Sequence, residues 1–203
     1  MYALVEDGSI TKLITNPKNM VIGDVRYPAK IFQLWLKSEL NAIGIYEVIT
    51  DSSNYKDEAY YINTNEQYNF ADNQVTKSWG TATAKRLNDE NAVDEDGNNL
   101  LDDDGNQVIN YGLKTEKKRI VKQQASGLLA PTDWYVVKST EVADYDIPAN
   151  VLSFRADVRT KSNEMETQID NCTTVDELKA LYEYTTQEDG TQTRLMPEFP
   201  KEI

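Results

Sequence analysis

Two hydrophobic patterns alternate along the chain and divide it into three stretches. Up to about residue 87, short apolar runs are separated by turns rich in Gly, Asp and Asn, which is typical of β-strands. From residue 114 onward, apolar residues recur at intervals of three and four, which is typical of helices. The stretch between them shows neither period. The sequence therefore predicts an α+β fold with a small β-rich module at 1–87, an acidic linker or hairpin insert at 88–113 and a mainly helical module at 114–203.

The β-rich module contains two hairpin signals and one helix signal. Asp7-Gly8 and Gly23-Asp24 each separate two apolar runs, and such pairs favour the positive φ angles of tight hairpins. Pro28 suits the first position of a helix and Gly44 suits its end. The apolar stripe of that helix places Trp35 in the core. Further short strands are predicted at 45–49, 60–62, 68–70 and 75–79.

In the helical module, a charged helix runs from Lys114 to near Gly127, and an apolar connection follows over 128–137. Pro148 then begins a long helix with Phe154 on its apolar side. Thr174 and Glu177 have the spacing of a capping box, so a second helix begins there. The proline-rich segment 195–200 is predicted to be extended.

Charge is concentrated in the middle of the chain. The net charge is −13, and residues 88–106 hold eight acidic side chains and no basic one. Such a chain is repelled by nucleic-acid phosphates and by anionic membranes. No stretch approaches the roughly 20 apolar residues of a membrane helix, and the N-terminus lacks the basic region of a signal peptide. We therefore expect neither a nucleic-acid nor a membrane partner.

The acidic stretch contains a repeat. Asp96-Gly97-Asn98 is echoed by Asp104-Gly105-Asn106, eight residues later. The favoured interpretation is a solvated linker or a pair of exposed turns, and the alternative is a calcium loop. An EF-hand needs an acidic residue five positions before its glycine. Ala92 and Leu100 occupy those positions, so that arrangement fails, although another calcium geometry stays open.

The residue types exclude most catalytic chemistry. There is no histidine, which removes histidine bases and most zinc sites. Cys172 is the only cysteine, so no intrachain disulfide forms. The chain has no glycine-rich phosphate loop and no nucleophile motif. We expect no enzymatic activity, no cofactor and no metal.

An ordered series of motifs in the helical module resembles the phage tail assembly chaperone domain. The series consists of Lys117-Lys118-Arg119, Leu128-Leu129, Thr132-Asp133-Trp134, Pro148, Phe154-Arg155 with Arg159, and Leu195–Pro200. The start of the chain and the stretch 42–48 also resemble the front half of such phage proteins. The acidic insert has no counterpart in the family, and residues 185–193 separate the last helix from the tail segment.

The resemblance implies a tail-fibre or tail assembly chaperone that binds a tail or fibre subunit in the cytoplasm of the infected host. The alternative is a structural component of the virion, such as a tail, fibre-base, baseplate adaptor or decoration subunit. Incorporation in the tail or assembly as a homo-oligomer stays open. The candidate partner-binding residues are Leu128, Leu129, Asp133, Trp134, Tyr135, Phe154, Arg155, Arg159, Met196 and Phe199.

Most of these residues also have a purely structural interpretation. Trp134 and Tyr135 are interpreted first as core residues that close a helical hairpin. Asp133 is interpreted as a cap or turn former that accepts backbone N–H groups. Arg155 and Arg159 lie on one helix face, and pairing within the chain is favoured over pairing with a partner. The run at 117–119 is interpreted as a solvated helix face.

Overall fold

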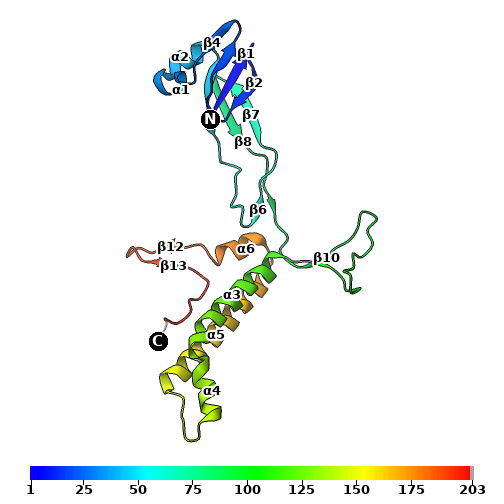
Figure 1. Cartoon of the computed structure of the whole chain (residues 1–203), viewed down its shortest axis with the longest axis vertical. Helices are drawn as coiled ribbons and strands as arrows, with labels where there is room; N and C mark the ends of the chain where they lie inside the picture. Colours follow the sequence, from blue (N-terminus) through cyan, green and yellow to red (C-terminus); the bar gives the residue numbers. More distant parts are fainter. Residues whose placement is uncertain (202–203) are drawn as a thin grey trace. The chain divides into compact units, whose positions relative to one another are not determined.

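The computed structural model describes residues 1–201 and divides the chain into two compact units, Met1–Thr83 and Ala84–Ile203. The first unit is built mainly from strands and the second mainly from helices (Figure 1). The predicted α+β class is therefore confirmed. The acidic insert belongs to the helical unit.

A curled five-stranded sheet forms the first unit. Its strands, in spatial order, are β2 (Ser9–Ile14), β1 (Tyr2–Glu6), β5 (Ile45–Thr50), β8 (Gln74–Ser78) and β7 (Gln67–Ala71). All neighbours are antiparallel except β5 and β8, which are parallel. The predicted Asp7-Gly8 turn joins β1 and β2, with φ of 49° and 76° at these residues. The two edge strands, β2 and β7, lie close to each other, which gives the sheet its curl.

Alternation along β1 supplies both sides of the sheet with core residues. Leu4 packs with Ile45 and with residues of the two short helices, while Ala3 and Val5 pack with Val75 on the opposite face. Successive side chains of a strand point to opposite faces, so one strand contributes to two hydrophobic clusters. This explains why three consecutive residues of β1 are all buried.

The prediction of one continuous helix after Pro28 is wrong. Two short helices stand there instead, α1 (Ile31–Leu34) and α2 (Lys37–Ala42). The chain is extended at Trp35 and Leu36, and the Leu36 N–H donates to the Glu39 carboxylate at 2.7 Å. Next to this break, Trp35 is 36% exposed, and its ring and that of Tyr27 meet edge to face with their centroids 5.9 Å apart. The prediction of Trp35 as a core residue is therefore wrong.

Gly44 ends α2 as predicted, in the left-handed region with φ of 81°. A Cβ at this position would lie 2.6 Å from the carbonyl oxygen of Val5. The Val5 N–H donates to the Gly44 carbonyl at 2.8 Å. Both the backbone conformation and the close approach of β1 therefore require glycine. The remaining small ladders pair β3 (Met20–Ile22) with β4 (Val25–Tyr27) and β6 (Tyr61–Ile62) with β9 (Thr83–Ala84).

An antiparallel pair of long helices forms the body of the second unit, α3 (Leu113–Leu129) and α5 (Ala149–Asn171), shown side by side in Figure 1. Pro148 precedes α5, as predicted. The buried residues of α5 recur every three or four positions from Val151 to Ile169, which is the period of a single helix face. Lys118 pairs with Asp170 at 2.7 Å and Lys122 with Glu166 at 3.3 Å. Two lysines of α3 thus pair with acidic residues of α5, whereas Arg119 of the basic run is exposed and pairs with Glu116 of its own helix at 3.0 Å.

The segment after α3 is helical, which corrects the predicted connection at 128–137. A 3-10 turn (Ala130–Thr132) leads directly into α4 (Asp133–Glu141). At the other end of the pair, α6 (Val175–Ala180) begins with the predicted capping box, because the Glu177 N–H donates to the Thr174 hydroxyl at 3.1 Å. The strands β12 (Thr185–Thr186) and β13 (Gln192–Thr193) form a hairpin, and the Met196 N–H of the extended tail donates to the Leu181 carbonyl at 2.8 Å.

The acidic insert folds around a ring of backbone hydrogen bonds. Its stem pairs β10 (Glu90–Asn91) with β11 (Ile109–Asn110). Beyond the stem, three backbone hydrogen bonds of 2.8 to 2.9 Å form a closed ring. The N–H of Leu100 donates to the carbonyl of Ala92, the N–H of Val108 to the carbonyl of Leu100, and the N–H of Ala92 to the carbonyl of Val108. The Gln107 amide nitrogen lies 2.9, 3.2 and 2.9 Å from the carbonyl oxygens of the same three residues. The eight-residue repeat therefore builds two hairpin loops that meet at one closed hub.

Candidate interaction surfaces

The helix α4 carries exposed apolar side chains at the end of the α3–α5 pair. It buries no residue, and Figure 1 shows it beyond the last turns of the two long helices. Trp134 is 51% exposed, and its ring stacks on that of Tyr135 with centroids 3.9 Å apart. We call the exposed apolar residues of this end the tip surface; they are Trp134, Val136, Val137, Val142 and Leu152.

The interpretation of Trp134 as a core residue is therefore wrong. The segment forms a helix of its own, in which about half of the Trp134 side chain is exposed. Tyr135 is only half-buried. The sequence contained a signal for this exposure: residues 134–137 are four consecutive apolar residues. Four consecutive positions span more than one face of a helix, so a helix packed on one side leaves part of the run exposed.

Arg155 anchors the start of α4 to α5. This buried guanidinium donates to the Leu129 carbonyl at 3.1 Å and to the Thr132 hydroxyl at 2.5 Å. It also forms an ion pair with the Asp133 carboxylate at 2.8 Å. The favoured pairing of Arg155 within the chain is confirmed. The expected role of Asp133 as a backbone cap is corrected, because α4 has no side-chain cap and the carboxylate binds Arg155.

Arg159 lies one turn further along α5 and is exposed. One of its guanidinium nitrogens lies 3.3 Å from the Arg155 carbonyl. Together with Lys122 and Asn163 it lines an open hollow of about 410 Å³ between α3 and α5. Arg159 therefore remains accessible beside the anchored Arg155.

Several other candidate residues belong to the core of the helical unit. Phe154 is buried with Val158 and Ala125, and Leu128, Leu129 and Phe199 pack against this cluster. Met196 is also buried. The structure thus brings three of the candidates, Leu128, Leu129 and Phe199, together around a fourth, Phe154, and this cluster stabilises the helical unit. It places Trp134 and Arg159 outside that cluster.

The carboxylates that begin the two loops of the insert are used by their own turns. The Asp94 carboxylate accepts the N–H groups of Asp96 and Asn98 at 3.0 and 2.8 Å, and Asp102 accepts those of Asp104 and Asn106 at the same distances. The Asn98 N–H lowers the pKa of Asp94, and the Asn106 N–H lowers that of Asp102. Within residues 1–201, no group of three or more Cys, Asp or Glu side chains is arranged to hold a metal ion.

The single cysteine lies at the end of α5. Its thiol is buried and lies 3.3 Å from the Gln168 carbonyl. Burial raises the pKa of the Cys172 thiol. A raised pKa disfavours the nucleophilic thiolate, so this position has the character of a core residue.

No helix in the part of the chain that the structure describes is long and apolar enough to cross a membrane. Comparison with protein-family models, with curated proteins and with solved structures gave no match. The resemblance of residues 117–200 to the tail assembly chaperone domain therefore stays a prediction.

Proposed function

We propose that this chain is a bacteriophage tail assembly protein that binds a tail or tail-fibre subunit through the tip surface. The observation that supports this proposal most strongly is α4, an ordered helix that buries none of its own residues. Arg155 holds the start of α4 in place through three hydrogen-bonded groups. A helix that is anchored and yet uncovered presents apolar side chains to another molecule at little ordering cost.

The energetics of this surface suit reversible binding. Complete burial of an aliphatic or aromatic side chain contributes roughly 1.5 to 3 kcal/mol, and the tip residues are already partly covered. The free energy that five such residues supply is of the same order as the cost of association, about 4 to 15 kcal/mol, which is the balance of a complex that dissociates again. An assembly chaperone needs this balance, because it must release its subunit. The matching segment of the resemblance, Thr132-Asp133-Trp134, lies at the start of this helix.

The proposal is tested by co-expression with the tail-fibre subunit of the same phage. The variant Trp134→Ser with Val137→Ser removes two tip side chains and leaves Arg155 and its partners intact. We expect the yield of correctly trimerised fibre to fall at least about tenfold, since two interface anchors are lost. The matched control is Tyr184→Ser, because Tyr184 is 53% exposed in the same unit but lies outside the tip. Equal fibre yields from the tip variant and the wild type contradict the proposal.

The second candidate function is a structural component that stays in the virion. The observation that favours it is the closed hub of the acidic insert, because an ordered projecting arm suits a permanent contact better than a transient one. Quantitative mass spectrometry of purified particles separates the two functions. A stoichiometric amount of this chain in the virion supports the structural role, and its absence supports the chaperone.

A further inference from the structure

The first unit carries a basic groove beside the end of β2 and the β3–β4 hairpin. A hollow of about 620 Å³ is lined by Lys12, Asn19, Met20, Val21 and Arg26. A second hollow of about 170 Å³ shares Lys12 and Met20 with it and also includes Lys18. We define the basic groove by its three cations, Lys12, Lys18 and Arg26, together with its apolar residues Leu13, Met20 and Val21.

The cations of the groove have no counter-ion among the residues that the structure describes. None of the three forms an ion pair or a side-chain hydrogen bond within residues 1–201. The stretch 8–38 holds five basic side chains and a single acidic one, Asp24. Leu13 and Val21 are exposed beside the cations. The groove thus combines unpaired positive charge with uncovered apolar surface, which fits an acidic polypeptide that also carries apolar side chains.

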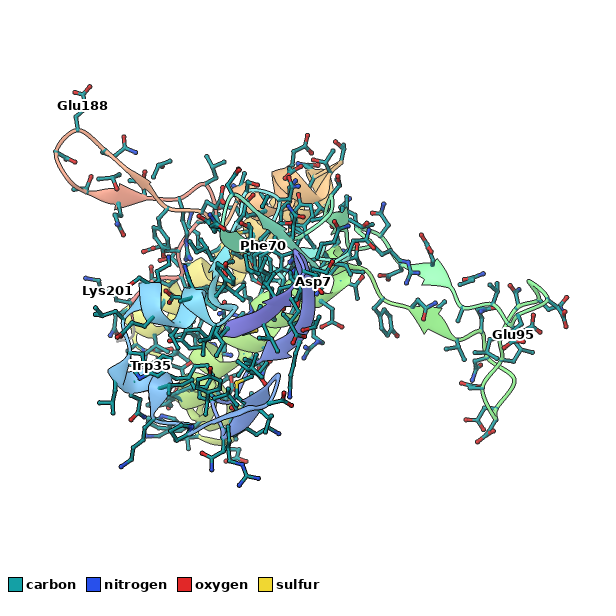
Figure 2. The ribbon with its side chains drawn as sticks, turned by 90° about the horizontal axis from the view of Figure 1, so that it is seen from above. Asp7, Trp35, Phe70, Glu95, Glu188 and Lys201 are labelled. Carbon is teal, nitrogen blue, oxygen red and sulfur yellow. The ribbon has the colours of Figure 1, made fainter. Side chains whose placement is uncertain are left out.

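The chain itself contains a segment with this chemistry. The acidic arm, residues 92–108, holds six carboxylates and no basic residue. Its aliphatic residues Val93, Leu100 and Leu101 are exposed. Figure 2 shows Glu95 at the outer part of this arm, within a segment that has few side chains around it. Because the hub at Ala92, Leu100 and Val108 orders the arm, docking costs little conformational entropy.

We propose that the acidic arm of one copy of this chain docks in the basic groove of a second copy. The contact joins two different surfaces, so it is heterologous and leads to a ring or to an open chain of subunits. One arm provides less contact area than a standard interface of about 1,600 Å². We therefore expect weak self-association that depends on concentration and on salt, because exposed charges supply much of the attraction. The inference is independent of the proposed function, since it involves no residue of the tip surface.

Sedimentation velocity of the full chain tests the inference first. We expect the average mass to rise with protein concentration at an ionic strength of about 0.01 M and to return to that of the monomer at about 1 M, where the Debye length falls from about 30 Å to about 3 Å. A monomer at every concentration at low ionic strength overturns the inference.

Charge reversal then identifies the two surfaces. The groove variant carries Lys12→Glu, Lys18→Glu and Arg26→Glu. The arm variant carries Glu95→Lys, Asp96→Lys, Asp103→Lys and Asp104→Lys, and it leaves Asp94 and Asp102 to hold their turns. Each variant alone is expected to lose self-association by at least about tenfold. Lys30→Glu with Lys37→Glu is the control, because these cations lie in the same unit but do not line the groove.

Mixing the two variants distinguishes docking between copies from docking within one copy. A reversed arm complements a reversed groove, so the mixture is expected to form oligomers that contain the two variants in a one-to-one ratio, although neither variant associates alone. Folding of each variant is checked by circular dichroism and by the NMR spectrum of its backbone amides. If both variants are folded and the mixture stays monomeric, the inference is overturned. It is also overturned if a chain that carries both reversals becomes more compact without associating, because the arm then docks on its own groove.

Discussion

Helices α4 and α5 both carry aromatic and branched aliphatic residues, but their surroundings differ completely. Seven residues of α5 are buried, among them Phe154, Val158 and Ile169, whereas α4 buries none. Helix α5 runs alongside α3, while α4 lies past the end of that pair (Figure 1). Apolar residues thus stabilise the fold in one helix and are available for binding in the other.

The two arginines of α5 differ in the same way, in burial and in role. Arg155 is buried and connects three groups at the start of α4, while Arg159 is exposed on the next turn. A buried guanidinium with satisfied hydrogen bonds positions the backbone, and an exposed one contributes little to stability. Arg155 therefore contributes to this end of the molecule by holding α4 in place, and α4 carries the exposed apolar side chains.

The largest expected effect is the loss of stability when a buried aromatic residue of α5 is truncated. Phe154→Ala opens a cavity in the cluster with Ala125 and Val158, and we expect the free energy of unfolding to fall by about 3 to 5 kcal/mol. Urea denaturation followed by circular dichroism measures the change. A loss below about 1 kcal/mol contradicts the assignment of this cluster as the core of the helical unit.

The second expected effect concerns the anchor. Arg155→Ala removes one donor to the Leu129 carbonyl and one to the Thr132 hydroxyl, and we expect a loss of about 2 kcal/mol, since two charge-assisted hydrogen bonds are lost in a largely buried place. The exposed Asp133 carboxylate is rehydrated, which limits the cost. Arg159→Ala, one turn away, is the control and should change stability by less than about 0.5 kcal/mol. Equal effects of the two substitutions would remove the distinction between the arginines.

A smaller effect is expected at the tip. Trp134→Ala removes the larger ring of the exposed stack with Tyr135, and the free energy of unfolding should fall by about 1 to 2 kcal/mol, less than for Phe154→Ala, because about half of the side chain is already exposed. The same urea titration as for Phe154→Ala gives a direct comparison of two aromatic truncations. If the Trp134 variant is destabilised as strongly as the Phe154 variant, α4 belongs to the core.

The smallest effect is expected in the acidic arm, which resembles α4 in having almost no buried side chains. Its turns depend on Asp94 and Asp102, whose pKa values are lowered by backbone N–H donors. A lowered pKa stabilises the folded arm at every pH above the unfolded value of about 3.9, and this stabilisation is lost as the pH falls through the lower folded value. The amide shifts of Asn98 and Asn106 in an NMR titration report the transition, which should have its midpoint below about 3.9. The double variant Asp94→Asn with Asp102→Asn keeps an acceptor oxygen at each position and should abolish the pH transition. A midpoint above about 3.9 in the wild type would show that these two carboxylates do not stabilise the turns.

The predictions that succeeded depend on a few neighbouring residues. Asp7-Gly8 turns where predicted, Pro148 precedes α5, and Thr174 with Glu177 caps α6. In each case the backbone conformation follows from local steric preference or from a hydrogen bond within three residues. The eight-residue repeat of the insert was also visible, although its closed hub was not. The ring at Ala92, Leu100 and Val108 requires two loops to return to the same point, which local preference does not specify.

Three of the predictions that failed concern the surroundings of a side chain. The apolar stripe of one continuous helix predicts Trp35 in the core, and the closure of a helical hairpin predicts Trp134 there. A break between α1 and α2 exposes the first, and the end of the helix pair exposes the second. Asp133 was expected to cap a helix, but a buried guanidinium from α5 binds it instead.

By itself, the sequence determined the α+β class, the tight turns, the starts of α5 and α6 and the concentration of negative charge, because each depends on residues that are neighbours along the chain. The tertiary structure decided which apolar residues are covered and which stay exposed. Burial depends on the length and direction of elements far apart in the sequence, and α4 remains uncovered because the α3–α5 pair ends before it.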